Sequence, residues 1–200
     1  QPAGKTGLDY LLGRQLSQET IRKFGLGYAD KYSTSLYQYL KSKGYSDQLL
    51  KESGLMQVDE KRGMYDKFWN RVIFPIMDIH NRVIGFGGRV MGDGKPKYLN
   101  SPETMVFDKS RNLYGLNLAR LSRKPNIILC EGYMYVIAMH QAGFSQAVAS
   151  LGTAFTAQQS VILKRYTGEV LLTYDSDEAG VRAALRAIPI LKEAGLAAKI

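Results

Sequence analysis

The last third of the chain alternates apolar runs with helix-like segments, and this alternation limits the folds open to it. Strands are predicted at 126–130, 146–149 and 169–174, and helices at about 133–142, 156–165 and 178–194. The final residues, 197–200, look like the beginning of another strand. A β-α-β-α-β-α order with this spacing favours a parallel sheet joined by right-handed crossovers.

Acidic residues follow two of these predicted strands. Glu131 comes directly after the apolar run 127–130, and Asp175 and Asp177 come after the run 170–174. Side chains just past the carboxyl ends of parallel strands gather in one crevice, so we expect these carboxylates to meet. Three like charges in one crevice repel unless a cation neutralises them. Oxygen ligands without Cys or His suit Mg²⁺ or Mn²⁺, which predicts a metal centre for phosphate chemistry.

The first 120 residues have a different pattern. Residues 6–53 are expected to be helical, and 71–76 and 82–90 form a predicted antiparallel hairpin around the turn 78–81. Glycines in the second strand of this hairpin indicate close approach of the backbone or a bulge. The polar stretch 97–109 is expected to be an irregular binding segment. A domain boundary is expected near 115–125.

The charge balance favours a polyanionic partner. The chain has 27 Lys and Arg residues against 18 Asp and Glu residues, a net charge of +9. A cationic surface attracts a phosphate backbone through counterion release, although excess lysine also occurs in ordinary domains. The single cysteine, Cys130, excludes an internal disulfide and a Cys-based zinc site. No segment approaches the roughly 20 apolar residues of a membrane span, so we expect a cytoplasmic protein.

Several motifs together resemble those of the DnaG-type bacterial primase family. The acidic segments 131–134 and 175–180, with 149–154 between them, are similar to the Toprim fold of these primases. The segments 71–76, 83–89 and 96–104 separate primases from other Toprim proteins, and the segments 16–21 and 24–29 also fit the primase pattern. The resemblance implies an α+β amino-terminal subdomain of helices and antiparallel strands over 1–120. It implies an α/β Toprim subdomain with a parallel, Rossmann-like sheet over 121–200, truncated at its carboxyl end.

The resemblance also assigns site residues. It implies that Glu131, Asp175 and Asp177 are catalytic and bind Mg²⁺ or Mn²⁺. The basic and polar side chains that it implies for binding nucleic acid or nucleotide are Arg14, Arg89, Lys97, Tyr98, Asn100 and Lys109. Gly152 and Thr153 are candidates for lining the metal crevice, whereas His80 and His140 are expected to be surface or packing residues.

The implied activity is metal-dependent nucleotidyl transfer that makes RNA primers on a single-stranded DNA template during replication. The implied partners are the template, ribonucleoside triphosphates, the RNA primer and the replicative helicase. Primases of this family bind zinc in an upstream domain and contact the helicase through a C-terminal domain, and no motif of either domain is recognisable in this sequence. The chain is therefore expected to be a fragment of a cytoplasmic enzyme that works at the bacterial replication fork.

One position departs from the family pattern. The first acidic motif continues with aspartate in the family, but position 135 of this chain is tyrosine. This position lies one helical turn after Glu131, where an aspartate could join the metal shell directly or through water. A neutral phenol is a poor Mg²⁺ ligand, so we expect weaker metal binding and weaker catalysis, or an inactive fragment.

Two other functions remain as alternatives. The first is a Toprim-like nucleic-acid-binding module that has lost catalysis, which Tyr135 favours. The second is a nicotinamide-binding Rossmann enzyme. The glycine cluster at 85–88 disfavours this enzyme, because the cluster lies within a predicted strand and does not open a helix.

Overall fold

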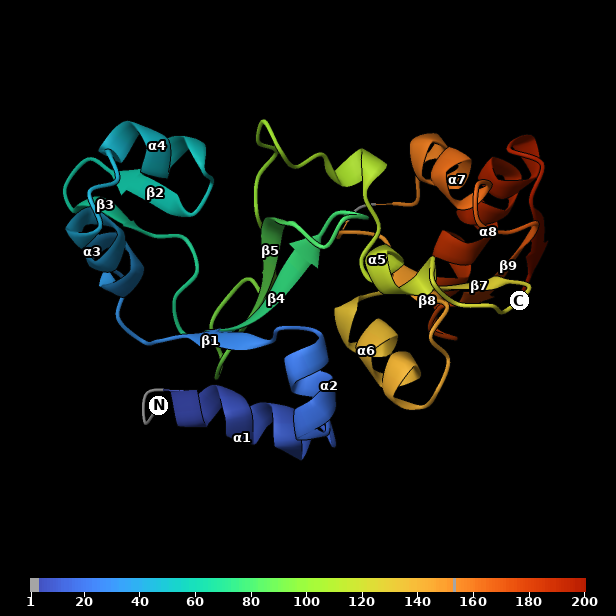
Figure 1. Ribbon diagram of the computed structural model, residues 1–200, viewed down its shortest axis with the longest axis horizontal. Coiled ribbons are helices and arrows are strands. Elements are labelled where there is room, and N and C mark those ends of the chain that lie inside the picture. The colour runs from blue at the N-terminus through green and yellow to red at the C-terminus, as the bar shows by residue number, and fades with distance from the viewer. Residues whose placement is uncertain (1–3, 153) are drawn as a thin grey trace. The chain divides into compact units, whose positions relative to one another are not determined.

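The computed structural model describes residues 4–152 and 154–200, which form two compact units (Figure 1). The first unit contains the residues before 76 together with 85–107, and the second contains 76–84 and 108–200. The boundary between the two units, after Phe107, comes earlier in the sequence than the domain boundary expected after residue 120. It does so because Leu113, Leu116 and Ala119 pack into the hydrophobic core of the second unit.

Helices and antiparallel strands build the first unit. Its helices are α1 (Lys5–Gly13), α2 (Gln18–Lys23), α3 (Ser35–Ser42) and α4 (Asp47–Glu52). Its larger sheet has the order β1-β4-β5-β6, with strands β1 (Gly27–Ala29), β4 (Arg71–Met77), β5 (Val83–Val90) and β6 (Tyr98–Asn100). A second sheet pairs β2 (Met56–Asp59) antiparallel with β3 (Gly63–Asp66). The β4–β5 neighbours confirm the predicted hairpin, whose tip, residues 76–84, belongs to the second unit. Its turn is closed by a 2.9 Å hydrogen bond from the Asp78 N–H to the Arg82 carbonyl.

Two local predictions for this unit are wrong. Residues 6–53 are not helical throughout, because Gly27–Ala29 form β1 and pair antiparallel with β4. The segment 97–109 is not wholly irregular, because Tyr98–Asn100 form β6 along β5. Both strands have three residues and lie at the outer edges of their sheet. Such short strands show no alternating apolar pattern, so pairing with a neighbouring strand defines them.

A buried carboxylate joins the two-stranded sheet to α3. Asp66, at the end of β3, is only 2% exposed. Its two oxygens accept hydrogen bonds from the backbone N–H groups of Leu36 and Tyr37, at 2.8 and 2.7 Å. The side chain of Thr34, the residue before α3, makes no capping bond. Asp66 therefore supplies from another element the acceptor that a helix start requires.

The second unit is a parallel α/β sheet, as predicted. Its strands are β7 (Ile127–Cys130), β8 (Ala147–Ala149), β9 (Glu169–Thr173) and β10 (Ala197–Lys199), all parallel in the order β10-β9-β7-β8. Its helices are α5 (Leu116–Ala119), α6 (Tyr133–Gln141), α7 (Ala157–Leu163) and α8 (Glu178–Glu193), preceded by the 3-10 turn η2 (Lys109–Arg111). None of the described helices has the length and apolar character needed to cross a membrane.

Buried side chains from strands and helices form the core of this unit. Leu129 in β7, Val148 in β8 and Leu191 in α8 are fully buried. Cys130 is 1% exposed at the end of β7, and burial raises the pKa of its thiol. His140 is buried in α6 with Nε2 2.9 Å from the Ala147 carbonyl oxygen. Packing thus fixes the central strand that leads to the acidic residues.

Removing the Asp66 carboxylate should destabilise the first unit. Two hydrogen bonds from N–H groups to a buried carboxylate contribute about 2 kcal/mol or more, so Asp66→Ala should lower the free energy of unfolding by about that amount. Urea unfolding followed by the fluorescence of Trp69 measures the change in this unit. Asp47→Ala is the matched control, because Asp47 is exposed and its ion pair with Lys41 lies at the surface. Equal stability of the two variants would contradict a structural role for Asp66.

Candidate metal centre and nucleic-acid pocket

The register of two parallel strands brings Glu131 and Asp175 together. β7 and β9 are paired with Cys130 beside Thr173, so the chain leaves both strands at the same edge of the sheet. The backbone N–H of Asp175 donates to Oε2 of Glu131 at 3.2 Å. Both acidic side chains are exposed at this edge. The convergence expected from the strand order is therefore present for these two residues.

The third predicted acid, Asp177, caps a helix in this structure. Asp177 is the N-cap of α8, and its Oδ1 accepts the N–H of Gly180 at 2.8 Å. Within the ranges 4–152 and 154–200, no three His, Cys, Asp or Glu side chains are grouped closely enough to hold a metal ion. The structure thus brings two of the three predicted acids together and uses the third to start a helix.

Close packing at Gly180 fixes the loop that carries Asp175. A Cβ atom at position 180 would lie 2.1 Å from the carbonyl oxygen of Asp175, which is far inside van der Waals contact. The first turn of α8 can therefore lie against this loop only if residue 180 has no side chain. This requirement explains a glycine at a helical position where alanine is normally preferred.

The electrostatics of this edge suit a cation. Glu131, Asp175 and Asp177 form no ion pair with any Lys or Arg of the described residues. Burial, with a smaller contribution from the charge of Glu131, raises the pKa of Tyr174 to about 12. Exposed carboxylate oxygens without a basic partner are donors that fit a hard divalent ion. Both oxygens of Asp175, however, accept from the hydroxyl of Tyr135, at 2.8 and 3.0 Å.

Three of the predicted binding residues lie together in the first unit. Arg89 on β5 is paired with Tyr98 on β6, and its guanidinium lies 4.8 Å from the centre of the Tyr10 ring. Burial, with a smaller contribution from Tyr10, raises the pKa of Tyr98, whereas the charges of Arg89 and Arg14 lower it. Strand pairing thus places Arg89 beside Tyr98, and the charge of Arg14 acts on the same phenol.

The other predicted residues are more dispersed. Lys97 is exposed just before β6, and Asn100 is the last residue of that strand. Lys109 begins η2 in the second unit, where its carbonyl accepts from Nε2 of Gln159 at 3.0 Å. A shared basic surface of Lys109 with Arg89 and Lys97 stays a prediction. Gly152 is exposed after β8, and Thr153 lies outside the described residues.

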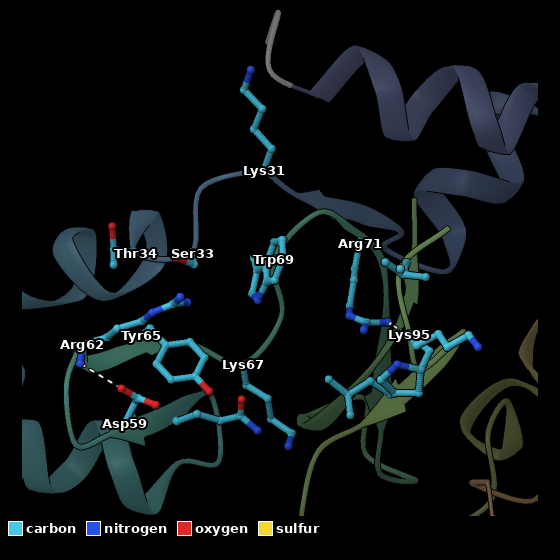
Figure 2. A pocket seen from close by; sticks show the side chains of 15 residues that line it. Lys31, Ser33, Thr34, Asp59, Arg62, Tyr65, Lys67, Trp69, Arg71 and Lys95 are labelled. Carbon is cyan, nitrogen blue, oxygen red and sulfur yellow. Dashed lines mark hydrogen bonds between the residues drawn. The ribbon is translucent and has the colours of Figure 1, made fainter. Parts of the chain in front are cut away.

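The first unit also contains a basic pocket that the sequence analysis did not single out. Its volume is about 640 Å³, and Figure 2 shows Trp69 between Arg71 on one side and Tyr65 with Arg62 on the other. Trp69 is 45% exposed. Basic side chains outnumber the single acid, Asp59, among the lining residues. The basic lining residues are Lys31, Arg62, Lys67, Arg71 and Lys95.

Arg71 gives this pocket a buried positive charge. It is 6% exposed, and its guanidinium donates to the carbonyl oxygens of Gly88 and Pro96 at 3.2 and 3.0 Å. Burial lowers its pKa, and it forms no ion pair with a carboxylate of the described residues. A Cβ atom at Gly88 would lie 3.0 Å from Cδ of Arg71, so the glycine leaves room for this side chain. Carbonyl dipoles satisfy the guanidinium without cancelling its charge.

The sequence signal for this pocket was a row of aromatic and basic residues at every second position. Tyr65, Lys67, Trp69 and Arg71 occupy alternate positions and all line it. The intervening Asp66 and Phe68 line a separate apolar cavity of about 500 Å³. Alternation of side chains between two faces is typical of extended backbone, and it is present here although residues 67–70 lie between β3 and β4 and Asn70 has a φ of 49°. An aromatic and basic face opposite a buried one was therefore readable from residues 65–71.

Comparisons with known proteins cover nearly the whole chain. A family model described as "DNA primase catalytic core, N-terminal domain" matches residues 1–120, and a model described as "Toprim-like" matches 128–200. The chain belongs to the DnaG family of DNA primase catalytic cores. This membership confirms the resemblance carried by the sequence motifs and the predicted fold class.

Individual DNA primases show the extent of the similarity. The DNA primase of Clostridium acetobutylicum is 52% identical over 192 residues, which are 96% of this chain and 32% of that protein. The DNA primase of Deinococcus radiodurans is 50% identical over 182 residues, which are 89% of this chain and 32% of that protein. The chain therefore spans about a third of the length of these relatives.

Solved primase structures have the same fold. A DnaG primase catalytic domain bound to ssDNA matches with a TM-score of 0.86 and 43% identity, over 94% of this chain and 59% of that one. The Escherichia coli primase catalytic core matches with a TM-score of 0.86 and 44% identity, over 94% and 61%. These structures are similar in both parts of the fold.

Substitution of Gly180 in this DnaG-family chain should displace the acidic edge. Gly180→Ala should destabilise the second unit by about 1–3 kcal/mol, because the new methyl group collides with the backbone at Asp175. The prediction is opposite in sign to the usual effect of Gly→Ala within a helix. Thermal unfolding of the variant measures it. Gly168→Ala is the control, since a Cβ atom there meets no atom within 4 Å, and an equal effect of both substitutions would contradict the steric argument.

Proposed function

We propose that this chain is the part of a bacterial DNA primase that contributes to RNA primer synthesis on single-stranded DNA. The observation that carries the proposal is the meeting of Glu131 and Asp175 at one edge of a parallel sheet, within a chain that matches primase catalytic cores. The reaction is nucleotidyl transfer from ribonucleoside triphosphates. The proposed setting is the replication fork in the bacterial cytoplasm.

The acidic edge is the proposed site of Mg²⁺ or Mn²⁺. Glu131 and Asp175 would hold the cation, with Asp177 joining them on release from its capping bond. When bound, a divalent ion supplies charge neutralisation for the triphosphate and activation of the attacking hydroxyl. The chain itself supplies exposed carboxylates that are not neutralised by its own basic residues. Gly180 holds the Asp175 loop in place for this role.

The basic pocket is the proposed path of the template. Single-stranded nucleic acid is held by basic grooves that carry aromatic side chains on which bases stack. Trp69 is exposed beside Lys67 and Arg71, which combines these two features in one place. Arg89, Arg14 and Tyr98, with Lys97 and Asn100 nearby in sequence, are the proposed contacts of the nucleotide or the primer. A relative of similar fold was solved bound to ssDNA.

Further partners follow from the relatives. A solved Aquifex aeolicus primase contains zinc-binding and RNA polymerase domains, and it matches 95% of this chain with a TM-score of 0.85 and 39% identity. Zinc would accordingly belong to a part of the protein upstream of this sequence. Contact with the replicative helicase would belong to a C-terminal part.

One observation favours a second candidate, a primase-like module that binds nucleic acid without catalysis. The Tyr135 hydroxyl donates hydrogen bonds to both carboxylate oxygens of Asp175, and position 135 is where the family has a further aspartate. Such a module would retain the basic pocket and its nucleic-acid binding. Primer synthesis separates the two candidates.

The catalytic proposal is tested by primer synthesis in the full-length protein that carries this chain. Radiolabelled ribonucleotides are supplied with a single-stranded template and Mg²⁺ or Mn²⁺, and the RNA products are resolved by size. Asp175→Asn should lower the yield at least about a hundredfold, since it removes a carboxylate from the cation site. Undiminished synthesis by this variant would exclude Asp175 from catalysis. No synthesis by the unsubstituted protein would favour the binding module.

Template binding is tested with a fluorescent oligothymidine and Trp69→Ala. Stacking of one base on an aromatic ring contributes about 1–3 kcal/mol, so affinity should fall about tenfold. The slope of affinity against salt should not change, because no charge is lost. Lys97→Ala should instead make the log–log slope shallower by about 0.7. Trp69→Phe is the matched control and should retain most of the affinity. Unchanged affinity of Trp69→Ala would place the template elsewhere.

A further inference from the structure

The phenol of Tyr135 occupies the acceptor oxygens of Asp175. Tyr135 lies in the first turn of α6 and is 47% exposed, and its hydroxyl is 2.8 Å from Oδ1 and 3.0 Å from Oδ2 of Asp175. A phenol has a single hydroxyl hydrogen, so the two carboxylate oxygens share one donor. The bond joins the start of α6 to the loop that follows β9.

A hydrated divalent cation needs the same oxygens. Mg²⁺ binds carboxylate oxygens at about 2.0–2.1 Å and requires near-ideal octahedral geometry. The Tyr135 hydroxyl donates to both oxygens of the Asp175 carboxylate, so it lies in the region that the ion and its waters must enter. The hydroxyl also draws on the lone pairs that would coordinate the ion. Cation binding to Asp175 and its hydrogen bond to Tyr135 are therefore in competition.

The other contacts of Asp175 and Glu131 do not prevent this competition. Asp175 has no Lys or Arg ion-pair partner within the described residues, and both of its carboxylate oxygens accept from the Tyr135 hydroxyl. Glu131 is engaged separately, by accepting the backbone N–H of Asp175. Loss of the Tyr135 hydroxyl would release Asp175 and leave the contact with Glu131 in place.

We infer that Tyr135 is an intramolecular competitor of the divalent cation at Asp175, and that a cation binds there only after the phenol is displaced. The inference rests on the metal site of the proposed function. It adds that this chain sets its own cation affinity through Tyr135. The tyrosine lowers the affinity by its hydrogen bond and not only by the absence of a carboxylate.

Mn²⁺ binding distinguishes these two effects. The Mn²⁺ affinity of the chain is measured by electron paramagnetic resonance of the free ion, without nucleotide or template. Tyr135→Phe removes the hydroxyl and adds no ligand, so it should tighten Mn²⁺ binding about threefold to tenfold, the size of one ordinary hydrogen bond. Tyr135→Asp should tighten binding further, because it adds a carboxylate. Tyr166→Phe, at another exposed tyrosine of the second unit, is the matched control and should leave affinity unchanged.

A double-mutant cycle identifies Asp175 as the point of competition. Asp175→Asn should weaken Mn²⁺ binding, and Tyr135→Phe should bring no gain in that background. Binding by Tyr135→Phe that is equal to or weaker than that of the unsubstituted chain would overturn the inference. An equal gain in the Asp175→Asn background would also overturn it, as would the absence of Mn²⁺ binding in every variant.

The outcome is separable from that of the proposed function. If Tyr135→Phe brings no gain while the full-length protein makes primers, the competition is absent and the primase function stands. If Tyr135→Phe binds Mn²⁺ more tightly while no variant makes primers, the competition is present and the catalytic proposal fails. Template affinity through Trp69 is measured without metal and does not depend on either result.

Discussion

The parallel pairing of β7 with β9 is the constraint on which the acidic edge depends. It sets Cys130 beside Thr173, and the first acids beyond both strands then lie within hydrogen-bond reach of one another. A slip of one residue would displace Asp175 along the strand by about 3.3 Å and break the contact with Glu131. The register is held by buried side chains of both strands, among them Leu129 and Leu172. Apolar packing inside the sheet therefore positions exposed charges at its edge.

Backbone groups satisfy both buried charges of the first unit, Asp66 and Arg71. Asp66 and Arg71 are both nearly fully buried, and neither is paired with an opposite side-chain charge among the described residues. Backbone N–H groups satisfy the carboxylate, and backbone carbonyls satisfy the guanidinium. Backbone dipoles can lower the cost of burying a charge without cancelling its field over the surroundings. The positive field of Arg71 thus reaches the pocket beside Trp69, where a phosphate group could respond to it.

The sequence predicted the second unit well because its signals were local and strong. Apolar runs separated by helix-length segments defined the parallel sheet, and the position of Glu131 and Asp175 after two strands defined their shared edge. The strand β1 was missed because it is three residues long and is defined by pairing with residues more than forty positions away. The capping role of Asp177 and the bond between Tyr135 and Asp175 depend on side-chain directions, which the sequence pattern does not specify.

Cys130 has a consequence beyond its place in the core. It is the single cysteine of the chain, and it lies in the central part of the second unit's sheet, where burial raises the pKa of its thiol. An alkylating reagent reaches such a thiol only when the strand around it opens. The rate of alkylation therefore reports the opening of the second unit alone. The single tryptophan, Trp69, belongs to the first unit, so each half of the molecule contains its own reporter and the cooperativity between the halves is open to direct measurement.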